Sequence, residues 1–79
     1  MKKTITLGEI RFVIQQVTTK HANEKNIQKK EEIEKDIGTI ILCIKKELGD
    51  FGAVAHNNNR INTKEILFTY EKISTYLQE

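Results

Sequence analysis

Proline and tryptophan are absent from this chain of 79 residues, and it contains one cysteine, Cys43. A single cysteine cannot form a disulfide within the chain, so a disulfide-based fold is excluded. The longest stretch without a polar side chain runs from Ile40 to Ile44, whereas a transmembrane helix needs roughly 20 such residues. Glu9 and Arg11 interrupt any apolar segment after the first lysines, so we expect no signal peptide. We therefore expect a cytoplasmic protein that does not associate with a membrane.

Charge of a single sign is also scarce, because 13 basic residues are set against 11 acidic ones, a net charge of +2. The charge is nevertheless uneven: +5 over residues 1–30, −3 over 31–50 and zero over 51–79. Lysine outnumbers arginine by 11 to 2, which argues against a protein that reads DNA sequence with arginine side chains. The basic N-terminal third keeps a small nucleic-acid-binding regulator open as an alternative function.

Motifs for catalysis or metal binding are missing as well. His21, Cys43 and His56 are 22 and 13 positions apart, which is not a spacing of metal ligands. The chain has no phosphate-binding loop, no dinucleotide fingerprint and no nucleophile paired with a base. We predict a protein that is not an enzyme and has no metal and no cofactor. Cys43 is predicted to be a buried or half-buried apolar residue, and His21 an amphipathic residue at the end of a helical bundle.

The first helix is predicted over residues 7–21. Thr6 and Glu9 have the spacing of a capping box, in which each side chain bonds to the backbone of the other residue. Apolar residues then recur at steps of three and four, as on one face of a helix. These residues are Leu7, Ile10, Ile14, Val17 and His21, with Val13 at the edge. The segment 1–5 is expected to be either frayed or a short extended piece.

The second helix is predicted over residues 24–48, with Asn23 or Asn26 as its N-cap. Gly49 is suited to the left-handed conformation that ends a helix. The apolar face consists of Ile33, Ile37, Ile40, Ile41, Ile44 and Leu48. Two opposite-charge pairs lie one turn apart on the surface and favour a helix: Lys30–Glu34 and Glu31–Lys35.

A connection over residues 49–62 lacks a clear period and is long for a link between two helices. An alternative interpretation is a small hairpin over 53–61 that turns on the asparagines 57–59. Asn62 is predicted to open a third helix over 63–78, with Glu65 three residues further on. The apolar face of that helix consists of Ile66, Tyr70, Ile73 and Leu77.

These elements predict an all-α fold. It is a small antiparallel three-helix bundle with a long central helix and a long loop before the last helix. The whole chain, 1–79, is expected to form a single helical domain. Because the core of so small a monomer supplies only about 3–5 kcal/mol, a homodimer is an alternative to a monomer.

Three large apolar residues, Phe12, Leu42 and Phe68, do not fit the apolar faces and lie on the polar side of their helices. In one interpretation, the long connection covers a second side of the bundle and buries these three residues with its own apolar side chains, Phe51, Val54 and Ile61. In the other, the three residues belong to an interface with a partner or a second copy of the chain. Gly38, one turn before Leu42, would then permit close approach of another chain.

The polar loop around His56 and Arg60 is a further candidate for partner binding, because loops carry function more often than cores do. The alternative is that the loop is turn material only. Isoleucine, lysine, asparagine and glutamate make up nearly half of the chain. Their codons are AT-rich, which favours a low-GC bacterium, a phage or a plasmid as the source.

The function class that these observations favour is a small non-catalytic protein–protein interaction module. We expect an inhibitor, an immunity factor or a regulatory protein that presents a helical surface to another protein or to a second copy of itself. The alternatives are a nucleic-acid-binding regulator and a structural component of a larger particle.

Overall fold

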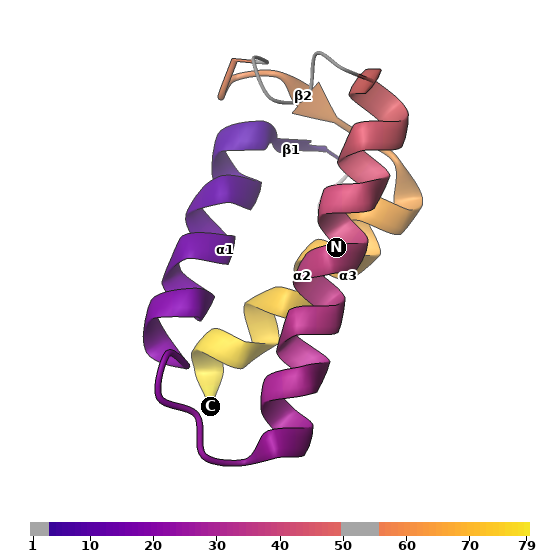
Figure 1. Cartoon of the computed structure of the whole chain (residues 1–79). Coiled ribbons are helices and arrows are strands. Elements are labelled where there is room, and N and C mark those ends of the chain that lie inside the picture. Colours follow the sequence, from indigo (N-terminus) through magenta and orange to yellow (C-terminus); the bar gives the residue numbers. More distant parts are fainter. Residues whose placement is uncertain (1–3, 50–55) are drawn as a thin grey trace.

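A computed structural model describes residues 4–49 and 56–79 of the chain, and their structure is mostly helical. The elements follow in the order β1 (Ile5–Thr6), α1 (Leu7–Lys20), α2 (Ile27–Leu48), β2 (Arg60–Ile61), α3 (Lys64–Thr75) and the 3₁₀ turn η2 (Tyr76–Gln78). In Figure 1, α1 and α2 lie side by side, and α3 crosses behind them and packs against both. The prediction of three helices is confirmed, whereas the expectation that the fold is all-α missed the two-stranded sheet.

Helix α1 begins and ends within one residue of the predicted range 7–21. Its N-cap is Thr6, whose hydroxyl oxygen accepts a hydrogen bond of 3.2 Å from the amide of Glu9. At the other end the amide of His21 donates to the carbonyl of Val17 at 3.0 Å. The start of α1 could therefore be predicted because both capping groups are close in sequence.

Helix α2 begins three residues later than predicted, because Asn26 rather than Asn23 is its N-cap. The side-chain oxygen of Asn26 accepts a hydrogen bond of 3.2 Å from the amide of Lys29. The helix ends at Gly49, whose φ of 61° is the left-handed conformation that glycine adopts readily. Among the described residues, neither predicted surface ion pair is within ion-pair distance: Lys30–Glu34 and Glu31–Lys35.

Helix α3 ends as an α-helix at Thr75 and continues as the 3₁₀ turn η2 to Gln78. The prediction that Asn62 opens this helix is wrong, because Thr63 is at the N-cap and makes no capping hydrogen bond. Its hydroxyl instead donates to the Oε2 atom of Glu47 in α2 at 2.5 Å. A contact between two helices therefore holds the start of α3.

The two strands join the segment before α1 to the segment before α3. They are antiparallel, with Ile5 opposite Ile61 and Thr6 opposite Arg60. This pairing shows that the segment before α1 is extended at Ile5, which was one of the two alternatives. The alternative hairpin over 53–61 falls partly outside the described residues, and Arg60–Ile61 pairs with β1 instead. The predicted long loop likewise falls partly outside them.

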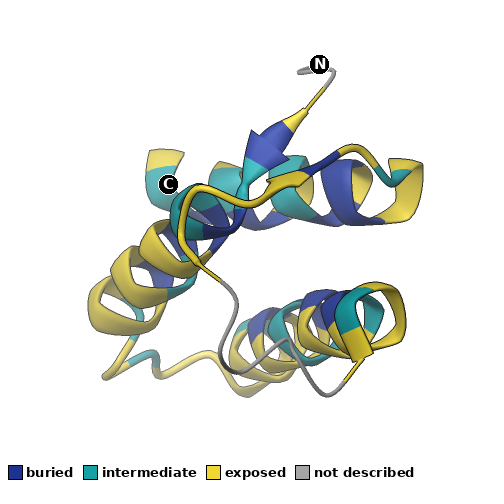
Figure 2. Cartoon of the chain, turned by 90° about the horizontal axis from the view of Figure 1, so that it is seen from above, coloured by how far each residue is buried: buried dark blue, intermediate teal, exposed yellow. Residues whose placement is uncertain are grey.

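The hydrophobic core is one cluster contributed by all three helices and both strands (Figure 2). Ile61 is 2% exposed and belongs to this core, whereas Phe51 and Val54 lie outside the described residues. Cys43 is half-buried against the cluster, as predicted. The fully buried side chains are Ile5, Leu7, Ile10, Val17, Ile40, Ile61, Ile66 and Ile73. Within the described residues, no helix has the length and apolar content needed to cross a membrane.

Candidate functional site

The packing of α3 leaves a seam between α1 and α2. Helix α3 contacts both α1 and α2, whereas α1 and α2 make few contacts with each other. In Figures 1 and 2, α3 lies across one side of the α1–α2 pair. Val17 of α1 and Ile40 of α2 are fully buried. The apolar faces of α1 and α2 are wider than α3 alone can cover.

A hollow of about 360 Å³ lies in the seam, at the end near the start of α1 and the end of α2. A volume of this size is at the lower end of that of small ligand sites. We call it the α1–α2 groove. It is lined by Leu7, Ile10, Arg11, Ile14, Gln15, Ile41, Ile44 and Lys45.

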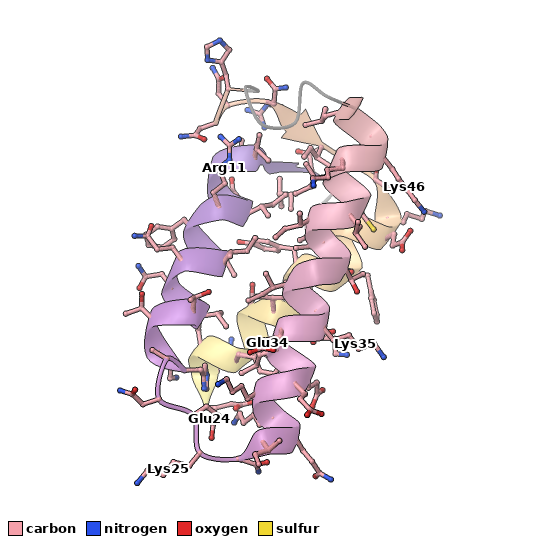
Figure 3. All side chains as sticks on the ribbon, in the orientation of Figure 1. Arg11, Glu24, Lys25, Glu34, Lys35 and Lys46 are labelled. Atoms are coloured by element: carbon pink, nitrogen blue, oxygen red, sulfur yellow. The ribbon has the colours of Figure 1, made fainter. Side chains whose placement is uncertain are left out.

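The groove combines apolar walls with positive charge. Five of its eight lining residues are leucine or isoleucine, and Ile41 is 41% exposed although it is aliphatic. Arg11 lies on the α1 wall and Lys45 on the α2 wall, and none of the described residues that line the groove carries a carboxylate. Arg11 donates a hydrogen bond of 2.5 Å to the side-chain oxygen of Asn57, so the loop before β2 helps to position this cation (Figure 3).

Further along the seam lies a smaller hollow of about 180 Å³. Its walls include Lys30 and Glu34, and its charge is therefore mixed. His21 and Thr18 add polar groups from α1. The positive, carboxylate-free character is thus a property of the α1–α2 groove and does not extend along the whole seam.

The three predicted interface residues, Phe12, Leu42 and Phe68, are 60%, 62% and 63% exposed. Each lies on the side of its helix away from the core. Successive residues turn a helix by about 100°, so each of the three lies about 160° around its helix from the fully buried residue two positions before it. The described structure does not bury them, so covering by described loop residues is excluded. They also do not come together, because α1, α2 and α3 pack with their buried faces inward and carry these residues outward in different directions.

The other two predicted residues, His56 and Arg60, are exposed on the loop and strand that precede α3. The backbone of this loop contacts the start of α1. The amide of Leu7 donates to the carbonyl of Asn59 at 2.9 Å, and that of Gly8 donates to the carbonyl of Asn57 at 2.7 Å. The loop therefore completes the N-terminal turn of α1 beside the groove. Within the described residues, no hydrogen bond or ion pair joins the side chain of His56 to that of Arg60.

The five aliphatic residues of the groove were all assigned to core faces by their helical spacing. Leu7, Ile10 and Ile44 are indeed buried, whereas Ile14 is half-buried and Ile41 is exposed. A signal was present in the adjacent pair Ile40 and Ile41. Consecutive residues lie about 100° apart on a helix, so one neighbouring helix cannot bury both of them.

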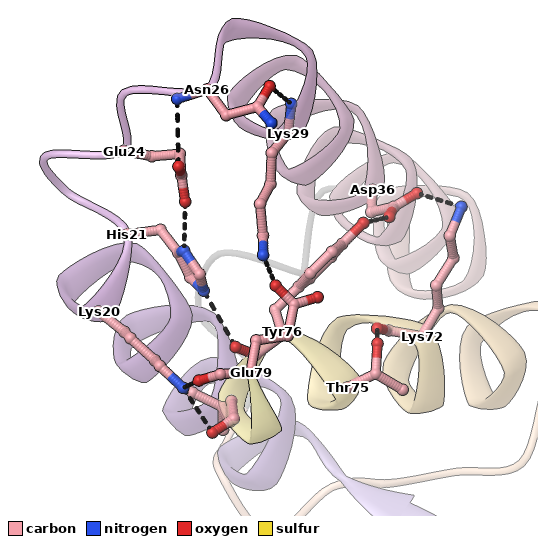
Figure 4. A network of polar contacts seen from close by, with 11 residues as sticks. Lys20, His21, Glu24, Asn26, Lys29, Asp36, Lys72, Thr75, Tyr76 and Glu79 are labelled. Carbon is pink, nitrogen blue, oxygen red and sulfur yellow. Dashed lines mark hydrogen bonds and ion pairs between the residues drawn. The ribbon is translucent and has the colours of Figure 1, made fainter.

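A second polar feature is the buried carboxylate of Asp36, shown in Figure 4. The hydroxyl of Tyr76 donates a hydrogen bond of 2.6 Å to its Oδ2 atom, and Lys72 lies 3.2 Å from its Oδ1 atom. Burial, and then the hydrogen bond to Asp36, raise the pKa of the Tyr76 hydroxyl well above its usual value. The group is a link between α2 and the C-terminal turn.

The same end of the molecule holds the C-terminus by charged groups (Figure 4). Lys20 donates to the carbonyls of Leu77 and Glu79 at 2.7 and 2.6 Å, and Lys29 forms an ion pair with Glu79. His21 contacts the carbonyl of Tyr76 through Nε2 at 3.0 Å. These contacts attach η2 to α1 and α2.

Glu24 completes this network through the other ring nitrogen of His21, at 3.1 Å. The amide of Asn26 donates to the Oε2 atom of Glu24 at 3.2 Å. This hydrogen bond, and to a smaller extent the one from His21, lowers the pKa of the Glu24 carboxyl. The network therefore orders the link between α1 and α2 as well as the C-terminal turn.

Burial raises the pKa of the Cys43 thiol, which disfavours the reactive thiolate. Among the residues that the structure describes, no group of three or more histidine, cysteine, aspartate or glutamate side chains could hold a metal ion. Asp36 and Tyr76 face each other and are occupied by their own contacts.

The chain matches no protein-family model, no curated protein and no solved structure among the known proteins with which it was compared.

Proposed function

We propose that this protein is a small non-catalytic interaction module that binds another protein through the α1–α2 groove. The observation that carries the proposal is the hollow between α1 and α2, where Ile41 is 41% exposed and Ile14 is half-buried. Exposed apolar surface that is rimmed by polar groups is typical of binding sites. The same site would accept a second copy of the chain, in which case the protein is a homodimer.

Such a module would act as an inhibitor, an immunity factor or a regulatory protein, in the cytoplasm of a low-GC bacterium or one of its mobile elements. In this proposal the three helices form an antiparallel bundle, which the short link 21–26 between α1 and α2 supports. A bundle of this kind presents a preformed surface, so little ordering free energy is lost on binding.

The basic N-terminal third gives less support to the nucleic-acid alternative. Lys20 donates to the C-terminal carbonyls, Lys29 pairs with Glu79, and Arg11 donates to Asn57. These contacts within the chain compete with contacts to phosphates. Titration with duplex and single-stranded DNA at low salt would favour the alternative only if both bind at micromolar protein.

The test of the proposed function is affinity capture from a lysate of the source organism. We expect the wild-type chain to retain a partner protein that is lost with Ile41→Glu, because the new carboxylate would have to be desolvated in an apolar site. Lys46→Glu is the matched control, since Lys46 is exposed, does not line the groove and points away from α1 (Figure 3). Equal capture by wild type and both variants would show that the groove is not the binding surface.

A further inference from the structure

The ring of His21, at the C-cap of α1, lies between two groups that accept hydrogen bonds (Figure 4). Its Nδ1 atom is 3.1 Å from a carboxylate oxygen of Glu24, and its Nε2 atom is 3.0 Å from the backbone carbonyl of Tyr76. The hydrogen bond from the amide of Asn26, and then the one from His21, lower the pKa of the Glu24 carboxyl, so this group is ionised at neutral pH. Neither of the two oxygens can therefore donate a hydrogen bond to the ring.

Only one protonation state of the imidazole satisfies this arrangement. A neutral imidazole has one N–H donor and one acceptor nitrogen, whereas the imidazolium cation has two donors. Both contacts of His21 are therefore hydrogen bonds only when the ring carries both protons. The side chain is 10% exposed, so water has little access to replace a lost contact. Histidine side chains change charge between about pH 5 and pH 8, and the arrangement should respond to pH in that range.

The two acceptors compete for the single proton of the neutral ring. A hydrogen bond to a carboxylate is roughly twice as strong as one to a neutral carbonyl. The remaining proton should therefore stay on Nδ1, where it faces Glu24. Nε2 then presents its lone pair to the carbonyl oxygen of Tyr76, and this contact becomes repulsive. The contact that depends on pH is thus the one between α1 and the C-terminal turn η2.

Charged groups of both helices and of the C-terminal end lie in the same region of the molecule as this ring. Besides Glu24 they are Lys20 of α1, Lys29, Lys30 and Glu34 of α2, and Glu79. The contacts of Lys20 and Lys29 with the C-terminal residues do not involve His21. The Tyr76 hydroxyl keeps its proton in this pH range, because burial and then Asp36 raise its pKa. Loss of the Nε2 contact therefore loosens η2 at one carbonyl and leaves its other attachments in place.

We propose that His21 is a pH-sensitive switch between α1 and η2. The doubly protonated ring joins Glu24, in the link after α1, to the carbonyl of Tyr76. Loss of one proton breaks the contact with Tyr76 and keeps the contact with Glu24.

The experiment is an NMR titration of the full-length chain between about pH 5 and pH 8, which follows the ring nitrogens of both histidines and the carbonyl carbon of Tyr76. We expect His21 to carry protons on both ring nitrogens at the acidic end and on Nδ1 alone at the basic end. The signal of the Tyr76 carbonyl carbon should shift with the same midpoint as the His21 ring. The control is His56→Gln, at the exposed second histidine, which should leave this shift unchanged.

Glu24→Gln separates the switch from a general effect of pH. A glutamine amide can donate to Nδ1, so the neutral ring can keep its proton on Nε2 and its bond to Tyr76. We expect the pH-dependent shift of the Tyr76 carbonyl to fall by at least half in this variant. A neutral wild-type ring protonated on Nε2, or a Tyr76 carbonyl that does not follow the ring, overturns the proposal, and the wild-type titration decides this even where the variant does not fold. Neither result bears on the proposed function, because His21 and Glu24 do not line the α1–α2 groove.

Discussion

Asp36 is the only charged residue that is buried within the described part of the chain, and its surroundings explain how burial is tolerated. A buried carboxylate without partners is strongly unfavourable. Here Tyr76 donates a hydrogen bond to one oxygen, and Lys72 lies close to the other. Asp36 lies among charged residues in the sequence of α2, and nothing in this local pattern indicates a partner 40 residues away.

Removing the Tyr76 hydroxyl tests this link. Tyr76→Phe leaves one oxygen of Asp36 without its donor, so we expect a loss of about 1–3 kcal/mol in the free energy of unfolding at neutral pH. Chemical denaturation monitored by circular dichroism measures this loss. The matched control is Tyr70→Phe, at a half-buried tyrosine of α3, and it should cost less because water reaches a half-buried position more readily than a buried one. Equal losses for the two variants would contradict the special role of the pair.

The same hydroxyl predicts a dependence on alkaline pH. The pKa of Tyr76 is raised in the folded state, by burial first and then by Asp36, whereas an unfolded tyrosine titrates near about 10. The folded protein therefore binds a proton that the unfolded chain loses, and this contribution to stability is complete below pH ~10 and falls above it. Between pH 8 and pH 11, wild type should lose more stability than Tyr76→Phe. Parallel pH profiles of the two proteins would refute this.

At the scale of the elements, the helices follow from local signals, and their ends show how local those signals are. Thr6 and Asn26 cap α1 and α2 through the amide three residues later. The start of α3 is different, because Thr63 bonds to Glu47 of another helix. The sequence therefore identified the caps that bond within their own helix, Thr6 and, as one of two candidates, Asn26, and it missed Thr63, whose hydroxyl makes a tertiary contact.

Gly38 within α2 and Gly49 at its C-cap should have opposite effects on stability when each is replaced by alanine. Gly38 lies within the helix, and a methyl group added there would meet no atom within 4 Å, so Gly38→Ala should stabilise the protein by about 1 kcal/mol. Gly49 has a φ of 61°, and Gly49→Ala should destabilise it by about 1 kcal/mol because that backbone conformation is strained for alanine. Thermal unfolding should place the two variants on opposite sides of wild type. A lower melting temperature for Gly38→Ala would show that this glycine has a packing role.

At the scale of the whole molecule, the arrangement of α3 across α1 and α2 decides which apolar residues are core and which are surface. The face of α2 that carries Ile40 is fully covered, whereas Ile41 lines the groove. Leu42, on the far side, is 62% exposed. Three consecutive residues of similar hydrophobicity thus have three different environments.

The contrast between buried and exposed positions predicts two different effects of truncation. Ile40→Ala should cost about 2–5 kcal/mol, because it leaves a cavity in the core. Leu42→Ala should change stability by less than about 0.5 kcal/mol, as expected for a surface position, and so should Phe12→Ala and Phe68→Ala. The measurement is urea denaturation at several protein concentrations. A large loss for an exposed residue, growing as the protein is diluted, would indicate that it lies in an interface between copies.

The spacing of apolar residues and the caps are local properties, so the sequence alone sufficed to predict three helices and most of their ends. It also sufficed to place Phe12, Leu42 and Phe68 outside the apolar faces, although their role as partner-binding residues stays a prediction. The β1–β2 pairing, the Tyr76–Asp36 bond and the groove join residues that are far apart in the chain. They depend on how α3 packs, because a helix whose apolar face is wider than its neighbour leaves part of that face uncovered. Helical periodicity specifies that face but not its partner.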